Sequence, residues 1–155
     1  MPSILVINPN SSVKVTNNLR NILKAPAGLT LEFYTAPSSS PEEIDGTETL
    51  ILSEKATLPD LLEKKLHLAH DGYLVCCYSD HPLTRTDASE FKKISDRVDL
   101  FLQEYKNEKI DCVLLGCAGM AGLDEKLAEI YPDIEFVDSC KAGVAFLLSL
   151  MAFAK

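Results

Sequence analysis

The sequence predicts an α/β fold in which a parallel sheet carries helices on both faces. Short apolar runs alternate along the chain with longer stretches of helical apolar spacing. The connections between them are rich in residues typical of turns. Strands that alternate with helices in this way pair in parallel through right-handed crossovers. Because the length suits one domain, residues 1–155 are predicted to form a single α/β domain.

The first elements are a strand, a helix and a second strand. A β-rich apolar run at 4–7 stops at the sequence Asn-Pro-Asn-Ser-Ser of residues 8–12. Ser11 or Ser12 can cap the helix that follows. Alternating residues at 29–34 then predict the second strand.

A longer helical stretch follows at 47–70, and Pro59 is expected to break or kink it. Its leucines are predicted to form a buried stripe, made of Leu58, Leu61, Leu62, Leu66 and Leu68.

The second half of the chain repeats the alternation. The predicted elements are a buried strand at 73–77, a helix at 88–109, a strand at 110–115, a short helix to about 130, a strand at 134–137 and a helix from 139. The apolar run 142–154 in the last helix is shorter than the ~18 residues of a membrane span. It is therefore predicted to be a buried helix.

Composition and charge exclude several classes of function. With 46% hydrophobic and 25% charged residues, the composition is that of a globular protein. The net charge of -8 repels phosphate backbones and anionic lipids, so no nucleic-acid or membrane partner is expected. The five cysteines form an odd number without a secretory signal, which predicts free thiols in the cytoplasm.

Ligands of such sheets bind at the carboxyl ends of the strands. Three loops should lie there: residues 8–12, 77–85 and 116–122. The first loop offers amides, hydroxyls and backbone N–H groups at a helix N-terminus, which suit a carboxylate or a polarised carbonyl. The same residues also fit a capped turn that binds nothing.

Cys77 and Cys117 occupy equivalent positions, each at the end of a predicted strand. A thiol that faces a helix N-terminus has a lowered pKa, which favours acid–base or nucleophilic chemistry. Two such thiols across a cleft could take a proton from one face of a carbon and deliver one to the other, without a cofactor. The remaining three cysteines are predicted to be inert packing residues: Cys76, Cys112 and Cys140.

The other candidate motifs favour neither nucleotides nor metals. Gly116, Gly119 and Gly122 could aim backbone N–H groups at an oxyanion, or could simply form a tight turn. They do not match the dinucleotide fingerprint, and the cysteines lack zinc-ligand spacing, so no metal is predicted. His81 more plausibly contacts substrate or solvent than acts as a base for Cys77. The two other histidines, His67 and His70, are expected on the surface.

Three segments carry recognisable motifs: 4–12, with Asn-Pro-Asn-Ser-Ser; 74–83, with adjacent cysteines before Tyr-Ser-Asp-His-Pro-Leu; and 115–122, with Gly-Cys-Ala-Gly-Met. Together they resemble the hydantoin/allantoin racemase branch of the aspartate/glutamate racemase superfamily. The adjacent cysteines and the residues after them resemble its fungal members in particular. The pair Val137-Asp138 and the following Lys141-Ala142-Gly143-Val144 are similar to the last strand and helix of that family.

The resemblance implies a cofactor-independent racemase in which Cys77 and Cys117 are the acid and the base. The implied substrate is a cyclic ureide such as a hydantoin or allantoin, whose ring carbonyl acidifies the neighbouring C–H. A homo-oligomer is also implied. The substrate-binding residues that it implies are Asn10, Ser11, Asn8, Ser79, Ala118 and Gly119.

The chain departs from the family pattern in length. Only 40 positions separate Cys77 from Cys117, which leaves room for one helix and one strand, so a shortening is predicted near 84–90. The chain would hold one lobe and part of the other. Two alternative functions therefore stay open: an inactive racemase-family remnant that binds a small ligand or serves as a partner subunit, and a flavodoxin-like flavin-binding domain.

Overall fold

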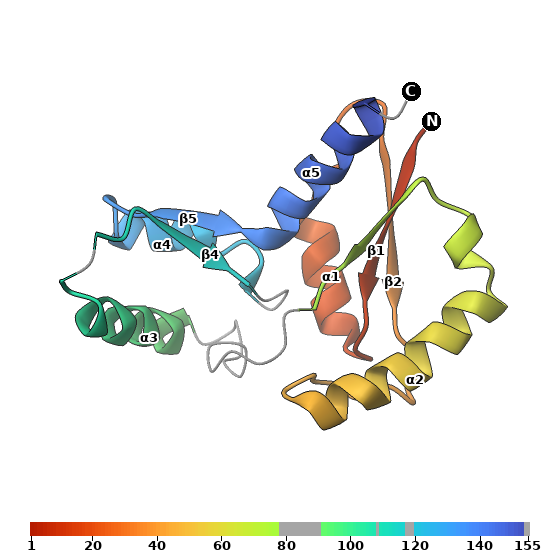
Figure 1. Ribbon diagram of the computed structural model, residues 1–155, viewed down its shortest axis with the longest axis horizontal. Helices are drawn as coiled ribbons and strands as arrows, with labels where there is room; N and C mark the ends of the chain where they lie inside the picture. Colours follow the sequence, from red (N-terminus) through yellow and green to blue (C-terminus); the bar gives the residue numbers. More distant parts are fainter. Residues whose placement is uncertain (78–90, 108, 117–119, 154–155) are drawn as a thin grey trace.

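The computed structural model describes residues 1–77, 91–107, 109–116 and 120–153 (Figure 1). In chain order the elements are β1 (Ser3–Asn8), α1 (Val13–Ile22), β2 (Thr30–Thr35), α2 (Thr47–Glu63), the 3-10 turn η1 (Leu66–Leu68), β3 (Gly72–Val75), α3 (Phe91–Glu104), β4 (Cys112–Leu115), α4 (Asp124–Ile130), β5 (Glu135–Asp138) and α5 (Ser139–Phe153). All of them were predicted except η1, but the helix expected at 47–70 ends at Glu63 and the helix expected at 88–109 ends at Glu104.

The strands form two parallel sheets. One has the order β2-β1-β3, with Ile4 opposite both Leu31 and Gly72, and the other pairs β4 with β5. The predicted α/β class and parallel pairing are confirmed. The division into two sheets was not predicted, because alternating elements specify parallel pairing but not which strands become neighbours.

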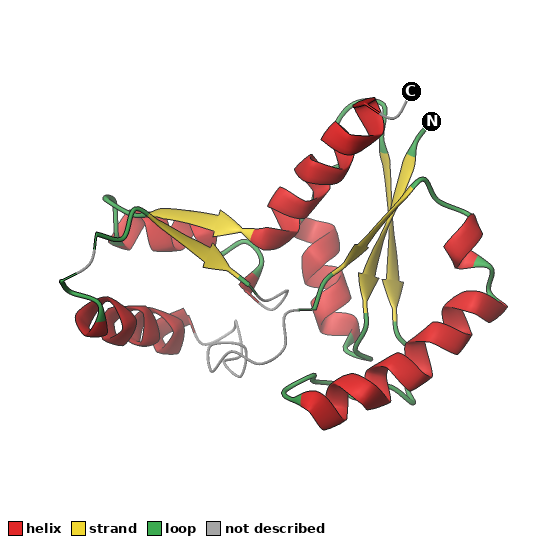
Figure 2. Ribbon diagram, in the orientation of Figure 1, coloured by secondary structure: helices red, strands yellow, loops and turns green. Residues whose placement is uncertain are grey.

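The three-stranded sheet has helices on both faces (Figure 2). Ile4 and Val6 of β1 point to one side, where their cluster includes Leu19 of α1 and Val144 of α5. The alternate residue Leu5 packs on the opposite side with residues of β2, α2 and η1. This alternation follows from the two-residue period of a strand.

The two-stranded sheet is covered on one face by α3 and α4. Leu115 of β4 and Phe136 of β5 pack there with Val98 and Leu127. On the other face Leu114 is 60% exposed. This second region therefore has a small, one-sided core, and β5 leads directly into α5, which crosses to the first sheet (Figure 1).

The predicted leucine stripe of α2 is wrong in part. Leu61 and Leu66 are partly buried against the sheet, but Leu58, Leu62 and Leu68 are exposed. The buried positions of α2 are polar, Ser53 and Thr57. The apolar pattern could not reveal this, because hydroxyls that find hydrogen-bond acceptors can be buried at little cost.

Pro59 does not end α2, which continues to Glu63. Proline has no backbone N–H, so the carbonyl of Lys55, four residues earlier, loses its helical hydrogen bond. Lys55 and Pro59 both lie on the exposed side of the helix. Water can therefore satisfy that carbonyl, which reduces the cost of an internal proline.

Two further burial predictions are wrong. β3 is an edge strand, and Val75 on it is 54% exposed, although a fully buried strand was expected. The last helix, α5, was expected to be buried but contributes only one face to the core. Both errors have one cause. An apolar run indicates that a segment prefers burial, but it does not show that another described element packs over that segment.

Candidate functional site at the carboxyl ends of the strands

The loop after β1 is held by a buried amide. Asn8 is fully buried, and its Nδ2 donates to the carbonyl of Ser12 and to Oγ1 of Thr16, both at 3.0 Å. Its Oδ1 accepts from the backbone N of Asn10 at 3.3 Å. The Asn8 side chain is thus engaged within the protein, and this geometry favours a role in positioning the loop over the predicted contact with a substrate.

The carbonyl of Pro9 accepts hydrogen bonds from three buried hydroxyls. The donors are Ser40 at 2.8 Å, Ser53 at 2.6 Å and Thr57 at 3.3 Å. Ser53 and Thr57 lie one turn apart on α2, so this helix and the loop before it fix the same carbonyl. The sequence analysis identified none of these three donors. The available signal was the spacing of Ser53 and Thr57, two hydroxyl residues four positions apart in a helix that was predicted to bury one face.

Asn10 and Ser11, both predicted to contact substrate, lie partly exposed at the tip of this loop. Oδ1 of Asn10 accepts from the backbone N of Ser12 at 3.0 Å, and the N of Ser11 donates to the carbonyl of Pro41 at 2.9 Å. Ser12, one of the two predicted caps, caps α1 by accepting from the N of Val15. These hydrogen bonds fix the backbone of the loop. Asn10 and Ser11 remain partly exposed to solvent at its surface.

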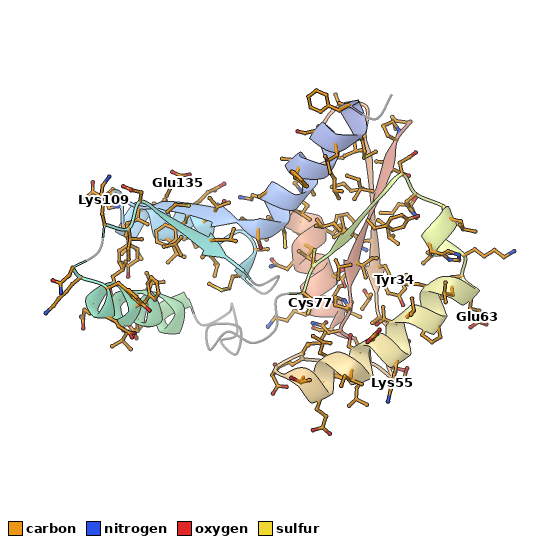
Figure 3. The ribbon with its side chains drawn as sticks, in the orientation of Figure 1. Tyr34, Lys55, Glu63, Cys77, Lys109 and Glu135 are labelled. Carbon is orange, nitrogen blue, oxygen red and sulfur yellow. The ribbon has the colours of Figure 1, made fainter. Side chains whose placement is uncertain are left out.

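Cys77 lies just past the end of β3, beside the end of β1 (Figure 3). The N of the preceding Cys76 donates to the carbonyl of Ile7 at 2.9 Å, which continues the ladder up to Asn8. Cys77 is partly exposed, whereas Cys76 is buried. Cys77 thus follows a strand that pairs with β1, the strand from which the loop 8–12 leaves.

Cys76 and Cys140 are both buried, and their sulfurs are 3.7 Å apart. The hydrogen bond to Cys140 and burial raise the pKa of the Cys76 thiol far above its usual range. Cys76 therefore stays a protonated thiol, and both cysteines are small packing residues of the core, as predicted. Cys112 was assigned the same role but is exposed, because β4 turns that side chain to the open face of its sheet.

Asp138 at the end of β5 ties the loop after β4 to helix α5. Its Oδ2 accepts from the N of Gly122 at 2.7 Å, and its Oδ1 accepts from the N of Cys140 at 2.8 Å and of Lys141 at 3.2 Å. An acidic side chain at this position caps the helix. Ser139 adds a hydrogen bond from its Oγ to the carbonyl of Leu115 at 2.7 Å.

Gly122 brings the two regions into contact. Its φ of +82° suits glycine, and a Cβ there would lie 2.7 Å from Cδ1 of Ile22 on α1. Beside it, Nδ2 of Asn18 donates to the carbonyl of Ala121 at 3.4 Å. Residues 121–122, which follow β4 in the chain, thus pack against α1. The loop 8–12 leads into the N-terminus of the same helix.

Several predicted site residues lie outside the described residues: Ser79, His81, Cys117, Ala118 and Gly119. Among the described residues, no group of three His, Cys, Asp or Glu side chains could hold a metal ion. His67 is exposed as predicted, but His70 is not: its side chain is 2% exposed and its Nε2 lies 3.1 Å from Glu32.

These features define an α/β protein whose candidate site lies where the ends of β1 and β3 meet the N-terminus of α5. The sequence model of the Asp/Glu/hydantoin racemase family matches residues 4–93 and 86–147. The chain belongs to that family.

Curated relatives come from two yeasts. Protein DCG1 of Saccharomyces cerevisiae is 35% identical over 120 residues, which cover 73% of this chain and 43% of that protein. The uncharacterized protein C1F7.10 of Schizosaccharomyces pombe is 26% identical over 222 positions, 97% of this chain and 92% of that protein. The chain thus spans less than half of DCG1. The alignment with C1F7.10 covers more positions than the 155 residues of this chain.

Two solved structures share the fold. Allantoin racemase from Pseudomonas fluorescens superposes with a TM-score of 0.67 at 19% identity, over 98% of this chain and 92% of that chain. Allantoin racemase from Klebsiella pneumoniae gives 0.61 at 16% identity, over 99% and 89%. In the part of the chain that the structure describes, no helix has the length and apolarity needed to cross a membrane.

Proposed function

We propose that this protein is a cofactor-independent racemase that inverts the carbon next to a carbonyl in a hydantoin- or allantoin-like cyclic ureide. Family membership supports an isomerase, and the two structural neighbours, both allantoin racemases, suggest the substrate class. Cys77 and Cys117 would be the acid–base pair. No nucleic acid or membrane partner is expected, and the cytoplasm is the proposed location.

One observation carries the proposal: residues 138–140 contact the neighbours of both cysteines. Cys140 touches Cys76, the residue before Cys77. Asp138 and Ser139 hold Gly122 and Leu115, which lie on either side of Cys117 in the sequence. One segment at the start of α5 is therefore bonded to both cysteine-bearing loops.

The proposed reaction needs only proton transfers. A thiolate on one face of the ring removes the proton from the stereogenic carbon, and the electron pair of that C–H bond moves toward the adjacent carbonyl oxygen as an enolate forms. The thiol on the other face then donates its proton to the carbon. The product is the mirror-image ureide, and the two cysteines have exchanged protonation states.

The surrounding residues would hold the ring and stabilise the enolate oxygen. Asn10 and Ser11 supply polar groups at the surface of the first loop, on a backbone fixed through the Pro9 carbonyl. Donors at Ser79, Ala118 and Gly119 are proposed from the family resemblance. Hydrogen-bond donors fixed in advance stabilise charge that develops during the reaction.

The test is racemisation of optically pure allantoin and 5-substituted hydantoins in heavy water. The expected result is loss of optical rotation with deuterium at the stereogenic carbon, faster than the uncatalysed exchange. Cys77→Ser and Cys117→Ser should each abolish this activity. Cys112→Ser, which removes an exposed thiol from the open face of β4, is the matched control and should keep it. Unchanged substrates with folded wild-type protein would contradict the proposal.

A second candidate function is an inactive family remnant that binds a small ligand or serves as a partner subunit. It is favoured by the family match, which falls in two pieces that overlap at 86–93, as a shortened middle near 84–90 would produce. Thiol-labelling kinetics separate the two functions. A racemase should contain a cysteine that reacts unusually fast at neutral pH and is protected by substrate, whereas a remnant should label slowly at all sites.

A further inference from the structure

Asp138, the last residue of β5, has a buried carboxylate that joins two segments of backbone. The residue is only 4% exposed. Its Oδ2 accepts from the N of Gly122 at 2.7 Å, and its Oδ1 accepts from the N of Cys140 at 2.8 Å and of Lys141 at 3.2 Å. Hydrogen bonds to an ionised acceptor are roughly twice as strong as neutral ones. Because all three donors are backbone groups, the carboxylate fixes the loop after β4 relative to the start of α5.

The chain after β4 is held at two points that lie on either side of Cys117 in the sequence. Before Cys117, the carbonyl of Leu115 accepts from Oγ of Ser139 at 2.7 Å. After Cys117, the N of Gly122 donates to Asp138. Leu115 is the last residue of β4, whereas Gly122 belongs to the loop itself. The bond to Gly122 therefore ties this loop directly to α5.

The strand that leads to Cys77 is held against α5 by different contacts. The sulfurs of Cys76 and Cys140 are 3.7 Å apart, within one core cluster. Further along the helix, a Cβ on Gly143 would lie 2.6 Å from Cδ1 of Leu74, so α5 lies directly on β3. These contacts are made by side chains and by close packing, and none of them is made by the carboxylate. The two cysteine-bearing segments are thus attached to α5 in two different ways.

Replacement of the carboxylate by an amide separates these two attachments. A carboxylate only accepts hydrogen bonds, whereas an amide has one accepting and one donating end. Asp138→Asn keeps two of the three bonds when its oxygen faces Cys140 and Lys141, and asparagine caps helices as well as aspartate does. Its NH₂ group then faces the N–H of Gly122, and two buried donors without an acceptor are costly. The variant should therefore keep the start of α5 and release the loop.

We propose that Asp138 is a positioning residue, which fixes the loop after β4, and with it one of the two reacting thiols, against α5. This inference rests on the proposed function, in which Cys77 and Cys117 act on opposite faces of the substrate ring. A reacting group that is displaced by about 1 Å loses on the order of 100-fold in rate. Loss of the bond to Gly122 should therefore impair the thiol of this loop and spare Cys77.

An enzyme with one misplaced thiol gives a distinct isotope pattern in heavy water. The Cys77 thiolate removes the proton from one enantiomer, and the electron pair of the C–H bond moves to the carbonyl oxygen. The resulting thiol exchanges its proton for deuterium from the solvent. Because the opposite thiol delivers slowly, the deuterium returns to the same face of the carbon, and the electron pair forms the new C–D bond. The recovered substrate is then deuterated but not inverted.

The experiment follows each enantiomer of allantoin and of a 5-substituted hydantoin in heavy water, by optical rotation and by NMR. Asp138→Asn should invert both enantiomers about 10- to 100-fold more slowly than the wild type. For one enantiomer alone, the ratio of deuterium exchange to inversion should rise by a similar factor. A variant that is only less stable would lower exchange and inversion equally, because fewer molecules would be folded.

Asp124→Asn is the matched control. It also removes a carboxylate that is bonded to α5, but the partner of Asp124 is the side-chain Nζ of Lys141, at 2.8 and 3.0 Å. It should therefore keep the wild-type ratio of exchange to inversion. Three results overturn the proposal: inversion by Asp138→Asn at the wild-type rate, exchange that falls in step with inversion for both enantiomers, or the same change of ratio in the control.

Amide hydrogen exchange measured by NMR tests the same contact without a substrate. The Gly122 amide should exchange about tenfold faster, or more, in Asp138→Asn than in the wild type and in Asp124→Asn, because a bond to a charged acceptor is lost. The amides of β1 should be unchanged. Unchanged exchange at Gly122 overturns the proposal. A wild type that racemises no substrate contradicts the proposed function alone, and the exchange at Gly122 then decides whether Asp138 fixes the loop.

A second variant covers the case in which Asp138→Asn does not fold, as judged by circular dichroism. Asp138→Ser keeps a hydroxyl that can cap α5. Its side chain is too short to bond Gly122 and α5 at once. The same increase in the exchange-to-inversion ratio and in Gly122 exchange is expected, and the same results overturn the proposal.

Discussion

The two regions of this protein differ in how completely the chain covers them. The three-stranded sheet has helices on both faces, and buried hydroxyls and amides fix the loop at its carboxyl end. The two-stranded sheet packs α3 and α4 on one face and exposes Leu114 on the other. Two strands with one covered face have little independent stability. The first region therefore acts as the scaffold, and the second depends on its attachment to it.

That attachment is concentrated at the start of α5. Asp138 and Ser139 bind the loop after β4, and Cys140 packs against Cys76 of the first region. The candidate site lies at this junction. A racemase with one cysteine on each region would need the two regions held at a fixed separation, so the stability of the second region becomes a condition for catalysis.

The largest expected effect comes from a matched pair of core truncations. Leu19 in the first region and Leu127 in the second are both fully buried. Each Leu→Ala change should lower the free energy of unfolding of its own region by about 2–5 kcal/mol. Leu19→Ala should shift the main urea transition. Leu127→Ala should instead speed hydrogen exchange in α4 and β5 and leave β1 protected, because the second region can open alone. Equal loss of protection in both regions would show that they unfold as one unit.

A smaller effect is expected at the contact between the regions. Gly122→Ala places a side chain at φ +82° and against Ile22, whereas Gly28→Ala meets the same backbone cost at φ +84° with nothing within 4 Å. The left-handed conformation alone costs about 1–2 kcal/mol. Thermal unfolding should show the larger loss for Gly122→Ala, which should also lower the proposed racemase activity. Equal losses would mean that Ile22 moves aside freely.

The order of elements was predictable because each element has a local signature. Apolar runs bounded by turn residues predicted the five strands, and Ser11 or Ser12 was predicted to cap α1, of which Ser12 does so. The cysteine at the end of β3 was placed correctly for the same reason. These features depend on residues close in sequence, where backbone preference and capping chemistry decide the structure.

The burial pattern was less predictable because it depends on distant partners. Ser53 and Thr57 are buried only because Pro9, more than 40 positions earlier, presents a carbonyl to them. The His70 side chain, which is only 2% exposed, has its Nε2 3.1 Å from Glu32, a residue 38 positions earlier. Leucines of α2 and the outer face of α5 are exposed because no described element lies over them. A single sequence does not state these long-range pairings.

Removal of one buried hydroxyl should have a moderate effect on the first region. Ser53→Ala leaves the Pro9 carbonyl with two of its three donors. The expected loss is about 1 kcal/mol in the free energy of unfolding, measured by urea titration. Ser95→Ala removes an exposed hydroxyl that donates to a helix carbonyl, and it should change stability by less than about 0.5 kcal/mol. If Asn10 and Ser11 bind substrate, Ser53→Ala should also raise KM more than it lowers kcat.

The smallest effect is expected at Asp60, on the side of α2 that contacts the first sheet. Its carboxylate accepts from Lys64 at 2.8 Å and from Tyr34 at 2.7 Å, and these hydrogen bonds hold the pKa of Asp60 below its usual value. The stabilisation is therefore complete above the unfolded pKa of about 3.9 and is lost as pH falls through the lower folded pKa. Asp60→Asn should cost less than about 1 kcal/mol at pH 7, because the pair with Lys64 is close to solvent. The difference between wild type and variant in urea midpoint should shrink steadily below pH 4. A difference that stays constant down to pH 2 would show that Asp60 stabilises the helix through packing and not through its charge.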